Sequence, residues 1–487
     1  MKNKKIYYPI VFIIIFFFSG CNVLDDEPVG VLSAEGYLTS EVQALEYVNA
    51  AYDMLTKRHT THRTLYLACD IKSDDSWNRE SRGFRDYSTM ADNETVALAW
   101  EYYYEAVRRC NRVIHGVADL SDEQIAPALR ERIVAEGKFL RAHYYFTMHQ
   151  LWYNVPLVLE VLPANAEALE IGQSSIEDFW AQIEKDLTEA AQVLPARSEY
   201  PAPEYGRATR GAANSLKAIV HLYQEEWQQA YDLANTVITS GEYELSPVFL
   251  DAFNVDENPE TVWSWRATDG GLVSGDQAAF GMTRWETSEG TEVPVWSRSR
   301  PFGGWMLRGI TQDLVDEFED GDPRKKYTVA APGDTIEGQV VGLDGYQSET
   351  GPLGNPLYGP RKLYYEGGWE PTTHKRNAGR DWPIIRLAEV YLVRAEASIR
   401  LNNLGGARDD INAVRGRADV QVTPVGDFAS QEEALEALIH ERRVELATNK
   451  SGSSTWYVGD LRMMSFQIWD SILTRMNIFP SLRHRLT

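Results

Sequence analysis

Cysteine is scarce in this chain of 487 residues, which has only Cys21, Cys69 and Cys110. None of them forms a Cys-x-x-Cys pair or combines with histidine at a zinc-ligand spacing, so a zinc-ribbon or zinc-finger fold is excluded and no metal is expected. Cys21 directly follows an apolar run and is a candidate for lipidation, so the thiols of Cys69 and Cys110 remain. A Cys69–Cys110 disulfide is compatible with an exported protein, but the sequence does not establish that these residues lie close together.

Long apolar segments and positive charge are also in short supply. Beyond residue 20 no apolar run approaches the length of about 20 residues that spans a bilayer. The 71 acidic residues outnumber the 48 lysines and arginines, which gives a formal net charge of −23. Because nucleic-acid affinity depends on neutralising phosphates with Lys and Arg, this balance excludes a nucleic-acid partner and favours a neutral or cationic one.

The motifs of common enzyme classes are missing as well. There is no His-Glu-x-x-His zinc motif and no Gly-x-Ser-x-Gly elbow. Residues 206–211 have the glycine spacing of a phosphate loop, but Ala212-Ala213 follow in place of Lys-Ser/Thr. Neighbouring carboxylates such as Asp74-Asp75 could serve a glycosidase, yet they are expected by chance among so many acidic residues. We therefore predict a protein that is not an enzyme and carries no cofactor.

The first 20 residues have the pattern of a secretory signal. Lysines near the start precede a short apolar run at residues 10–18, and Ser19-Gly20-Cys21 closes it. Small residues directly before a cysteine are typical of a lipoprotein signal, in which the Cys21 thiol accepts diacylglycerol. The pattern predicts a signal over residues 1–20 and an acidic tether over residues 21–40. A plain signal peptide or an N-terminal anchor helix is the alternative.

Helical periodicity dominates the first half of the chain, with predicted helices at residues 41–57, 96–117, 124–153 and 176–194. Ser40 is placed to cap the first of them. Residues 209–239 and 384–415 each predict two helices joined by a short turn, with small residues where the helices cross. This is the tetratricopeptide plan, although ordinary helical-hairpin packing fits the pattern about as well.

Residues 251–382 differ in character, being rich in Gly, Pro, Trp and Thr, and they predict long loops, short strands and one helix at residues 311–319. We expect a mostly α fold: one domain over residues 41–447, in which a tetratricopeptide-like helical-hairpin scaffold carries this loop- and strand-rich insertion. Loops on a rigid frame are where binding residues usually lie, so the insertion is expected to form the ligand side.

Eight short motifs resemble the SusD/RagB family of outer-membrane nutrient-binding lipoproteins, and they occur in the family's order. They lie at residues 100–111, 135–142, 155–157, 240–245, 320–324, 385–397, 411–415 and 441–447. The acidic stretch after Cys21 also resembles the signal that sends Bacteroidetes lipoproteins to the cell surface. Most motif residues are expected to be scaffold, with internal ion pairs made by Arg141, Glu389, Arg394, Glu396 and Arg415.

The resemblance implies a lipid-anchored protein on the exterior of the outer membrane. Such a protein captures oligosaccharides, or another polymer-derived nutrient, and passes them to a SusC-like TonB-dependent transporter. A peptide-capturing relative and a tetratricopeptide scaffold that binds proteins are the alternatives. Family members bind ligands mainly through aromatic platforms, because the C–H face of a sugar packs on a ring, while a few polar side chains fix its orientation.

Candidate ligand contacts lie in two places. The first is a polar loop with Asp75, Trp77, Asn78 and Arg82, and the second is the insertion, with aromatic residues Trp285, Trp296, Trp305 and Tyr346. For each aromatic residue the alternative is that its ring packs the loop layer onto the helices.

The C-terminus departs from the family pattern. After Ala447 the family continues with a further helix and a tail, whereas residues 448–487 are first Ser/Gly-rich and then mildly basic. With suitable synonymous codons this stretch re-reads in another frame as a sequence close to the missing helix. We hypothesise a frameshift near codon 448, which an intact frame in the sequenced gene would contradict.

Overall fold

The computed structural model describes the helical part of the chain and the segments that border the insertion. The described residues are 38–57, 59–60, 63–68, 73, 75–77, 82–85, 88–90, 93–162, 171–266, 309–331, 333–336, 339–340, 358–362 and 381–448. The signal, Cys21, the tether, most of the insertion and the C-terminal tail lie outside them.

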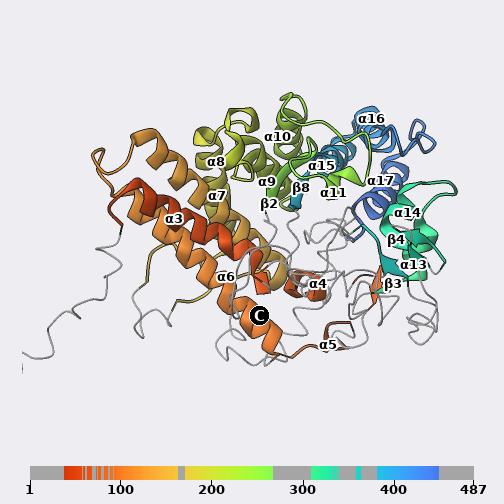
Figure 1. The fold of residues 1–487 in the computed structure, drawn as a ribbon. Coiled ribbons are helices and arrows are strands. Elements are labelled where there is room, and N and C mark those ends of the chain that lie inside the picture. Colours follow the sequence, from red (N-terminus) through yellow and green to blue (C-terminus); the bar gives the residue numbers. More distant parts are fainter. Residues whose placement is uncertain are drawn as a thin grey trace, which may run out of the picture.

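Successive helices pack side by side to form the scaffold in the upper part of Figure 1. They are α3 (Glu41–Asp53), α6 (Glu94–Arg112), α7 (Pro127–Trp152), α8 (Ile176–Val193), α9 (Arg210–Tyr223), α10 (Trp227–Ile238), α15 (Leu387–Arg400), α16 (Leu404–Arg415) and α17 (Gln431–Leu446). The mostly α prediction is confirmed. None of the described helices combines the length and the apolar composition of a bilayer span.

Helix ends follow local chemistry. Asn93, Ser175, Thr209 and Ser430 each accept hydrogen bonds from backbone N–H groups of the first helical turn. Ser40 is the N-cap residue of α3, as expected, but its hydroxyl donates to Gln43 Oε1 (3.0 Å) instead of capping a backbone N–H. These caps explain why most of the expected helix boundaries are right to within a few residues.

Two of the predicted boundaries are wrong for identifiable reasons. The helix expected from residue 124 begins at Pro127, since a proline fits the first helical position and keeps the preceding residue extended. The segment expected to be helical from residue 384 begins as strand β8 (Trp382–Arg386), and the helix starts only at Leu387. Ile384 and Ile385 are β-branched and buried, which suits a strand.

The two helical hairpins lie next to each other although about 175 residues separate their starts. Helix α10 of the first hairpin packs against α15 of the second, and α17 packs against α15 and α16. Arg394 on α15 joins the two hairpins: its Nη1 donates to Asn235 Oδ1 on α10 (2.7 Å), and its Nε donates to Asp410 Oδ2 on α16 (3.0 Å). This stacking is the tetratricopeptide-like arrangement, with the insertion placed between adjacent repeats.

The insertion leaves and rejoins the scaffold through an antiparallel strand pair. Strand β2 (Thr261–Trp265) pairs with β8, so that Thr261 lies opposite Arg386 and Trp265 opposite Trp382. Trp263 is 2% exposed, and its ring packs edge-on against Phe139 of α7 with the ring centroids 4.6 Å apart. The pair is therefore fixed to the core by large buried aromatic rings.

The described borders of the insertion are short helices and two-residue strands, in agreement with the predicted loops and short strands. They comprise α11 (Asp251–Asn254), β3 (Gly309–Ile310), α13 (Gln312–Glu317), α14 (Arg324–Thr328), β4 (Val329–Ala330), β5 (Thr335–Ile336), β6 (Gln339–Val340) and β7 (Gly359–Pro360). Helix α13 confirms the helix expected near residues 311–319. Its apolar face and β4 pack on α17 through a small cluster that includes Leu314 and Val444.

Candidate ligand-binding surface

The structure pairs the predicted polar loop with the described end of the insertion. Strand β1 (Ser76–Trp77) pairs antiparallel with β3, with Ser76 opposite Ile310 and Trp77 opposite Gly309. The pairing continues through the backbone, since Thr311 N donates to the carbonyl of Asp75 (3.0 Å). The polar loop and the returning end of the insertion are thus joined by main-chain hydrogen bonds, which the sequence alone did not indicate.

An ion pair holds this joint to the scaffold. Asp75 is only 5% exposed, and its Oδ1 accepts from Nε of Arg443 on α17 (2.8 Å). Arg443 also donates from Nη1 to Glu317 Oε2 on α13 (2.6 Å). The Asp75 carboxylate therefore fixes the loop in place, and a role for it in direct ligand contact stays a prediction.

The other predicted contacts are placed in part or not at all. The backbone of Trp77 lies in β1, and Arg82 begins helix α5 (Arg82–Arg85), but the side chains of both lie outside the described part of the structure. The same holds for the whole of Asn78, Trp285, Trp296, Trp305 and Tyr346. Their assignment as ligand contacts stays a prediction.

A solvent-facing aromatic cluster is a feature that the sequence reasoning missed. Trp100 belongs to a helix expected from its apolar periodicity, yet its side chain is 39% exposed. Its ring lies 5.0 Å from the ring of Tyr104 and 5.3 Å from that of Trp152 on α7, edge to face in the second case. The buried stripe of α6 runs through Ala99 and Tyr103, so Trp100 sits at its edge. Trp100 comes one residue after the buried Ala99, and a helical wheel drawn from the buried residues would have placed it at the edge of the apolar face.

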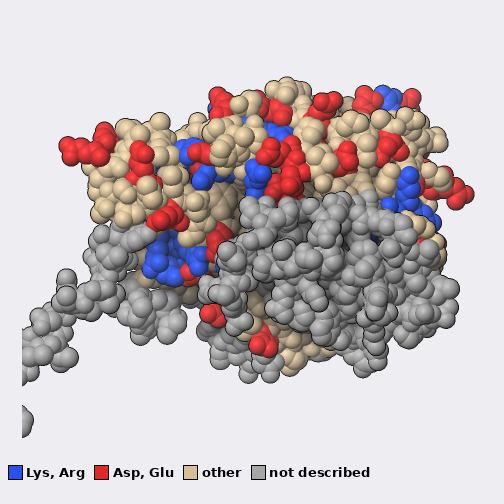
Figure 2. All heavy atoms as spheres, in the orientation of Figure 1, with Lys and Arg blue, Asp and Glu red and all other residues tan. Residues whose placement is uncertain are grey.

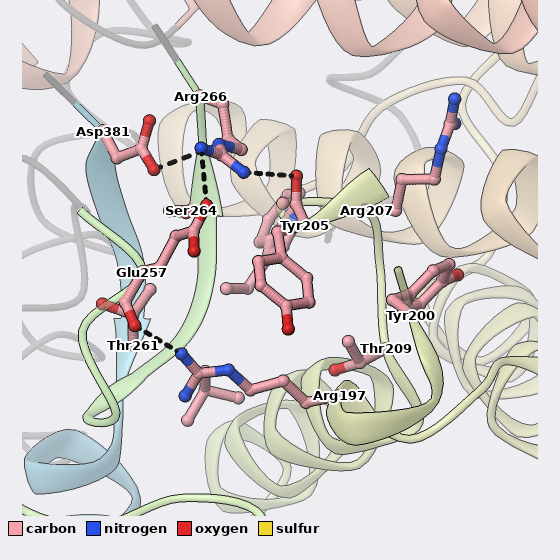
Figure 3. A pocket seen from close by; sticks show the side chains of 13 residues that line it. Arg197, Tyr200, Tyr205, Arg207, Thr209, Glu257, Thr261, Ser264, Arg266 and Asp381 are labelled. Atoms are coloured by element: carbon pink, nitrogen blue, oxygen red, sulfur yellow. Dashed lines mark hydrogen bonds and ion pairs between the residues drawn. The ribbon is translucent and has the colours of Figure 1, made fainter. Parts of the chain in front are cut away.

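A small hollow lies at the root of the insertion, between β2 and residues 197–209 (Figure 3). The Tyr205 ring points into it. Arg266 crosses one wall, with Nη2 3.0 Å from Glu257 Oε1 and Nε 3.2 Å from Asp381 Oδ2. Gly206, at φ 93°, is required here because a Cβ atom would lie 2.4 Å from Cγ of Arg266.

The volume of the hollow is about 40 Å³, enough for a few water molecules and too little to enclose an oligosaccharide. Arg197 at its floor donates to the carbonyls of Glu257 (2.7 Å) and Asn258 (3.0 Å). Arg197 and Arg266 thus both interact with acceptor groups of the chain itself. The hollow is a polar joint that fixes the point at which the insertion leaves the scaffold.

A buried charge cluster connects the insertion and strand β8 to helix α17. It combines four cations with four carboxylates, all at most 4% exposed: Arg324, Arg386, Arg417 and Lys362 with Asp322, Glu260, Glu441 and Glu445. Glu445 lies at its centre and accepts from Arg417 (2.8 Å), Arg386 (2.9 Å) and Arg324 (3.2 Å). Burial alone would raise the pKa of Glu445, but the three guanidinium groups lower it to about 2.

Lys362 connects this cluster to the end of α17. Its Nζ donates to the carbonyls of Glu445 (2.9 Å) and Ala447 (2.7 Å), which a helix C-terminus leaves without intrahelical partners. Burial lowers the pKa of Lys362 well below its ordinary value, and the neighbouring Arg386 lowers it further. A cation from the insertion thus caps the last helix that the structure describes.

The expected internal ion pairs are largely confirmed. Arg141 pairs with Asp186 (2.8 Å), Arg394 with Asp410 (2.5 Å), Arg415 with Glu441 (2.9 Å), and Glu396 lies 3.8 Å from Arg442. Glu389 is 3% exposed. The four pairs connect neighbouring helices of the scaffold.

Cys110 is a free thiol that is completely buried in the helical core. Burial raises the pKa of this thiol above its ordinary value, which keeps it protonated and unreactive. Cys69 lies outside the described residues. The bridge that the sequence left open is therefore not formed by Cys110.

The described helical face in Figure 2 carries many acidic side chains with Lys and Arg interspersed among them. No continuous basic stripe crosses the part of that face which is described.

Comparison with known proteins identifies the family. A profile described as "SusD family" matches residues 241–451, and one described as "Starch-binding associating with outer membrane" matches residues 25–222. The SusD-like protein P25 of Formosa agariphila is 25% identical, and the alignment covers 92% of this chain and 88% of that protein. The starch-binding protein SusD of Bacteroides thetaiotaomicron is 27% identical over 60% of this chain and 59% of its own length.

A crystal structure of a SusD-like protein from Bacteroides fragilis superimposes with a TM-score of 0.72, at 25% identity, over 88% of this chain and 87% of that one. The two profiles together span most of the sequence, and the gap between them contains helix α10. The chain belongs to the SusD/RagB family.

Proposed function

We propose that this protein captures oligosaccharides, as a lipid-anchored protein on the exterior of the outer membrane, and delivers them to a SusC-like TonB-dependent transporter. In this proposal residues 1–20 are the signal, Cys21 carries the lipid, residues 21–40 form the tether and residues 41–447 form the binding domain. The protein has no catalytic role in it.

The observation that carries the proposal is membership of a family in which one matching profile is described as starch-binding and associated with the outer membrane. The relative at 27% identity is itself named a starch-binding protein. Starch is not inferred for this chain, since the similarity to that relative is 27% identity over 59% of its length.

The β1–β3 joint supports the location of the site. It places Trp77 opposite Gly309, so that the polar loop and the chain following Trp305 share one backbone ladder. Trp100 adds an exposed ring on the helical side. Aromatic faces are what a neutral sugar requires, and they are compatible with a strongly acidic protein because a neutral ligand is not repelled.

The test is affinity electrophoresis and calorimetry of the protein from Asn22 onward against a panel of polysaccharides. We expect one glycan to retard migration, and we expect Trp77→Ala, Trp100→Ala or Trp296→Ala to weaken binding by roughly tenfold each, which is about 1.4 kcal/mol. Trp227→Ala is the matched control, because it removes an equal ring from α10, where Arg400 packs over it within the scaffold.

The outcomes separate the alternatives. Retardation with hydrolysis of the glycan would indicate an enzyme. No retardation by any glycan, together with binding of peptides, would favour a peptide-capturing relative. No binding of either would favour a protein-interaction scaffold. A second protein with the family reading frame restored after residue 448 distinguishes a damaged C-terminus from a wrong ligand class, since only the restored protein would then bind.

The anchor and the partner are tested separately. Labelled palmitate should be incorporated by the full chain and not by Cys21→Ala. The transporter should co-purify with the protein from outer membranes, and absence of any barrel protein from that preparation would contradict the delivery step.

A further inference from the structure

Two carboxylates and a buried histidine converge from three helices at the end of the first tetratricopeptide-like hairpin. Glu184 lies on α8, His221 lies in the last turn of α9, and Glu226 is the N-cap residue of α10. One ligand atom from each residue lies within 4.8 Å of the other two. We propose that Glu184, His221 and Glu226 form a binding site for a divalent transition-metal ion of the Zn²⁺ class.

The donor set favours this class of ion. An imidazole nitrogen with two carboxylate oxygens suits Zn²⁺ and its neighbours in the first transition row, whereas Mg²⁺ and Ca²⁺ prefer oxygen ligands alone. Three protein ligands leave a fourth position for water in a tetrahedral site.

The spacing requires only side-chain adjustment. At Zn–N and Zn–O distances of about 2.0–2.1 Å, tetrahedral ligand atoms lie about 3.3 Å apart. His221 Nδ1 and Glu226 Oε2 are 2.5 Å apart, so this contact has to open by less than about 1 Å, and the other separations are at most 4.8 Å, so none has to shorten by more than about 1.5 Å. The side chain of Glu226 is 38% exposed, so it has room to adjust, while His221 is 5% exposed and enclosed by the fold.

The charge balance is the second observation. Within the described residues neither Glu184 nor Glu226 forms an ion pair with a lysine or an arginine. Lys217, one turn earlier on α9, donates to the Thr188 hydroxyl (2.8 Å) and not to Glu184. Two carboxylates beside a buried imidazole are therefore left with excess negative charge, which a divalent cation would neutralise.

Neighbouring groups also orient the proposed ligand side chains. The Gln224 amide donates to Glu184 Oε1 (2.7 Å), which orients this carboxylate toward the cluster. The turn is held by its own backbone, since Glu226 N donates to the carbonyl of His221 (2.9 Å). The ligands are thus positioned by α8, α9 and α10 before any ion arrives, and an ion would cross-link these three helices.

The experiment is calorimetry of the untagged, chelator-treated protein with Zn²⁺, and with Mg²⁺ and Ca²⁺ as controls of donor chemistry. We expect one Zn²⁺ per chain and an increase in Tm, with no saturable binding of Mg²⁺ or Ca²⁺. Glu184→Gln and Glu226→Gln keep the shape of the side chains, and each should weaken Zn²⁺ binding roughly tenfold or more. Glu177→Gln, an exposed carboxylate in the first turn of α8, is the matched control and should change nothing.

Substitution with Co²⁺ gives an independent measurement, because a tetrahedral Co²⁺ centre has an intense visible absorption that should be lost in the Glu184→Gln, Glu226→Gln double variant. Two results overturn the proposal. Zn²⁺ binding that is equal in the wild type and the double variant would place the ion elsewhere. Absence of saturable Zn²⁺ binding would show that His221 and Glu226 form only a hydrogen-bonded pair. Neither result depends on glycan capture.

Discussion

Glu445 offers the most direct test of what holds the insertion to the scaffold. Its side chain is completely buried and receives hydrogen bonds from Arg324, Arg386 and Arg417, which come from the insertion, from strand β8 and from the segment before α17. Glu445→Gln keeps the volume but removes the charge, which leaves four buried cations with three carboxylates. Breaking a buried ionic network in this way costs about 3–5 kcal/mol of unfolding free energy.

The pKa of Glu445 gives a second way to calculate how much its charge stabilises the folded protein. A value lowered from 4.5 to about 2 on folding corresponds to about 3 kcal/mol of stabilisation at neutral pH. Because the folded pKa is the lower one, this contribution is fully present above the unfolded pKa and is lost as the pH falls through the folded value. It should be roughly halved near pH 3 and nearly gone by pH 2.

Urea unfolding followed by tryptophan fluorescence measures both effects. At pH 7 the Glu445→Gln variant should lose about 3 kcal/mol or more, and its difference from the wild type should shrink as the pH falls from 5 toward 2. Glu436→Gln removes the same charge from an exposed position on α17 and should stay within about 0.5 kcal/mol of the wild type. Equal midpoints for the two variants at pH 7, or a difference that does not vary with pH, would refute the reasoning.

Three further predictions concern packing, the loop joint and the buried thiol. Gly137→Ala should destabilise the protein by about 1–3 kcal/mol because a Cβ atom would lie 2.8 Å from Val113 Cγ1. Gly405 is an exposed position on α16 where a Cβ atom meets nothing within 4 Å, so Gly405→Ala should stabilise the protein by about 0.5–1 kcal/mol. Thermal melts that rank the two variants in the opposite order would contradict this. Arg443→Met should remove the ion pair between Asp75 and α17, speed proteolysis of the loop after β1 and weaken glycan binding. Unchanged cleavage and affinity would show that this ion pair does not hold the loop. Cys110 should resist thiol reagents in the native protein and react on unfolding without reductant, and its failure to react in denaturant would reveal a disulfide.

The scaffold could be predicted from the sequence because its helices are amphipathic and many carry capping residues. Thr209 and Ser175 mark the starts of α9 and α8, and both cap their helices as local chemistry requires. The error at residues 384–386 has a tertiary cause. Ile384 and Ile385 continue an apolar run that leads into α15, and only pairing with β2, more than 100 residues earlier, makes them a strand.

The candidate site could be predicted by region but not in its connections. The sequence indicated the loop around Asp75 and the insertion as separate places, and the pairing of Ser76 with Ile310 is a long-range contact with no local signal. Asp75 was chosen as a polar loop residue, yet its carboxylate is turned inward to Arg443. Exposure of a carboxylate depends on which helix lies beneath the loop, and this is set by the fold as a whole.

The arrangement of charges suggests why a scaffold of this kind can carry a large insertion between two stacked repeats. The helices α10 and α15 pack directly, so the hairpin stack does not depend on the intervening chain for its apolar contacts. The insertion is fixed at its borders by β2–β8 pairing, by buried rings such as Trp263, and by cations such as Arg324 and Lys362 that reach α17. Buried ion pairs are directional and fail when one partner is removed, whereas apolar packing tolerates shifts. Substitutions within the loops should therefore alter ligand binding with little effect on stability, while substitutions in the charge cluster should lower stability and binding together.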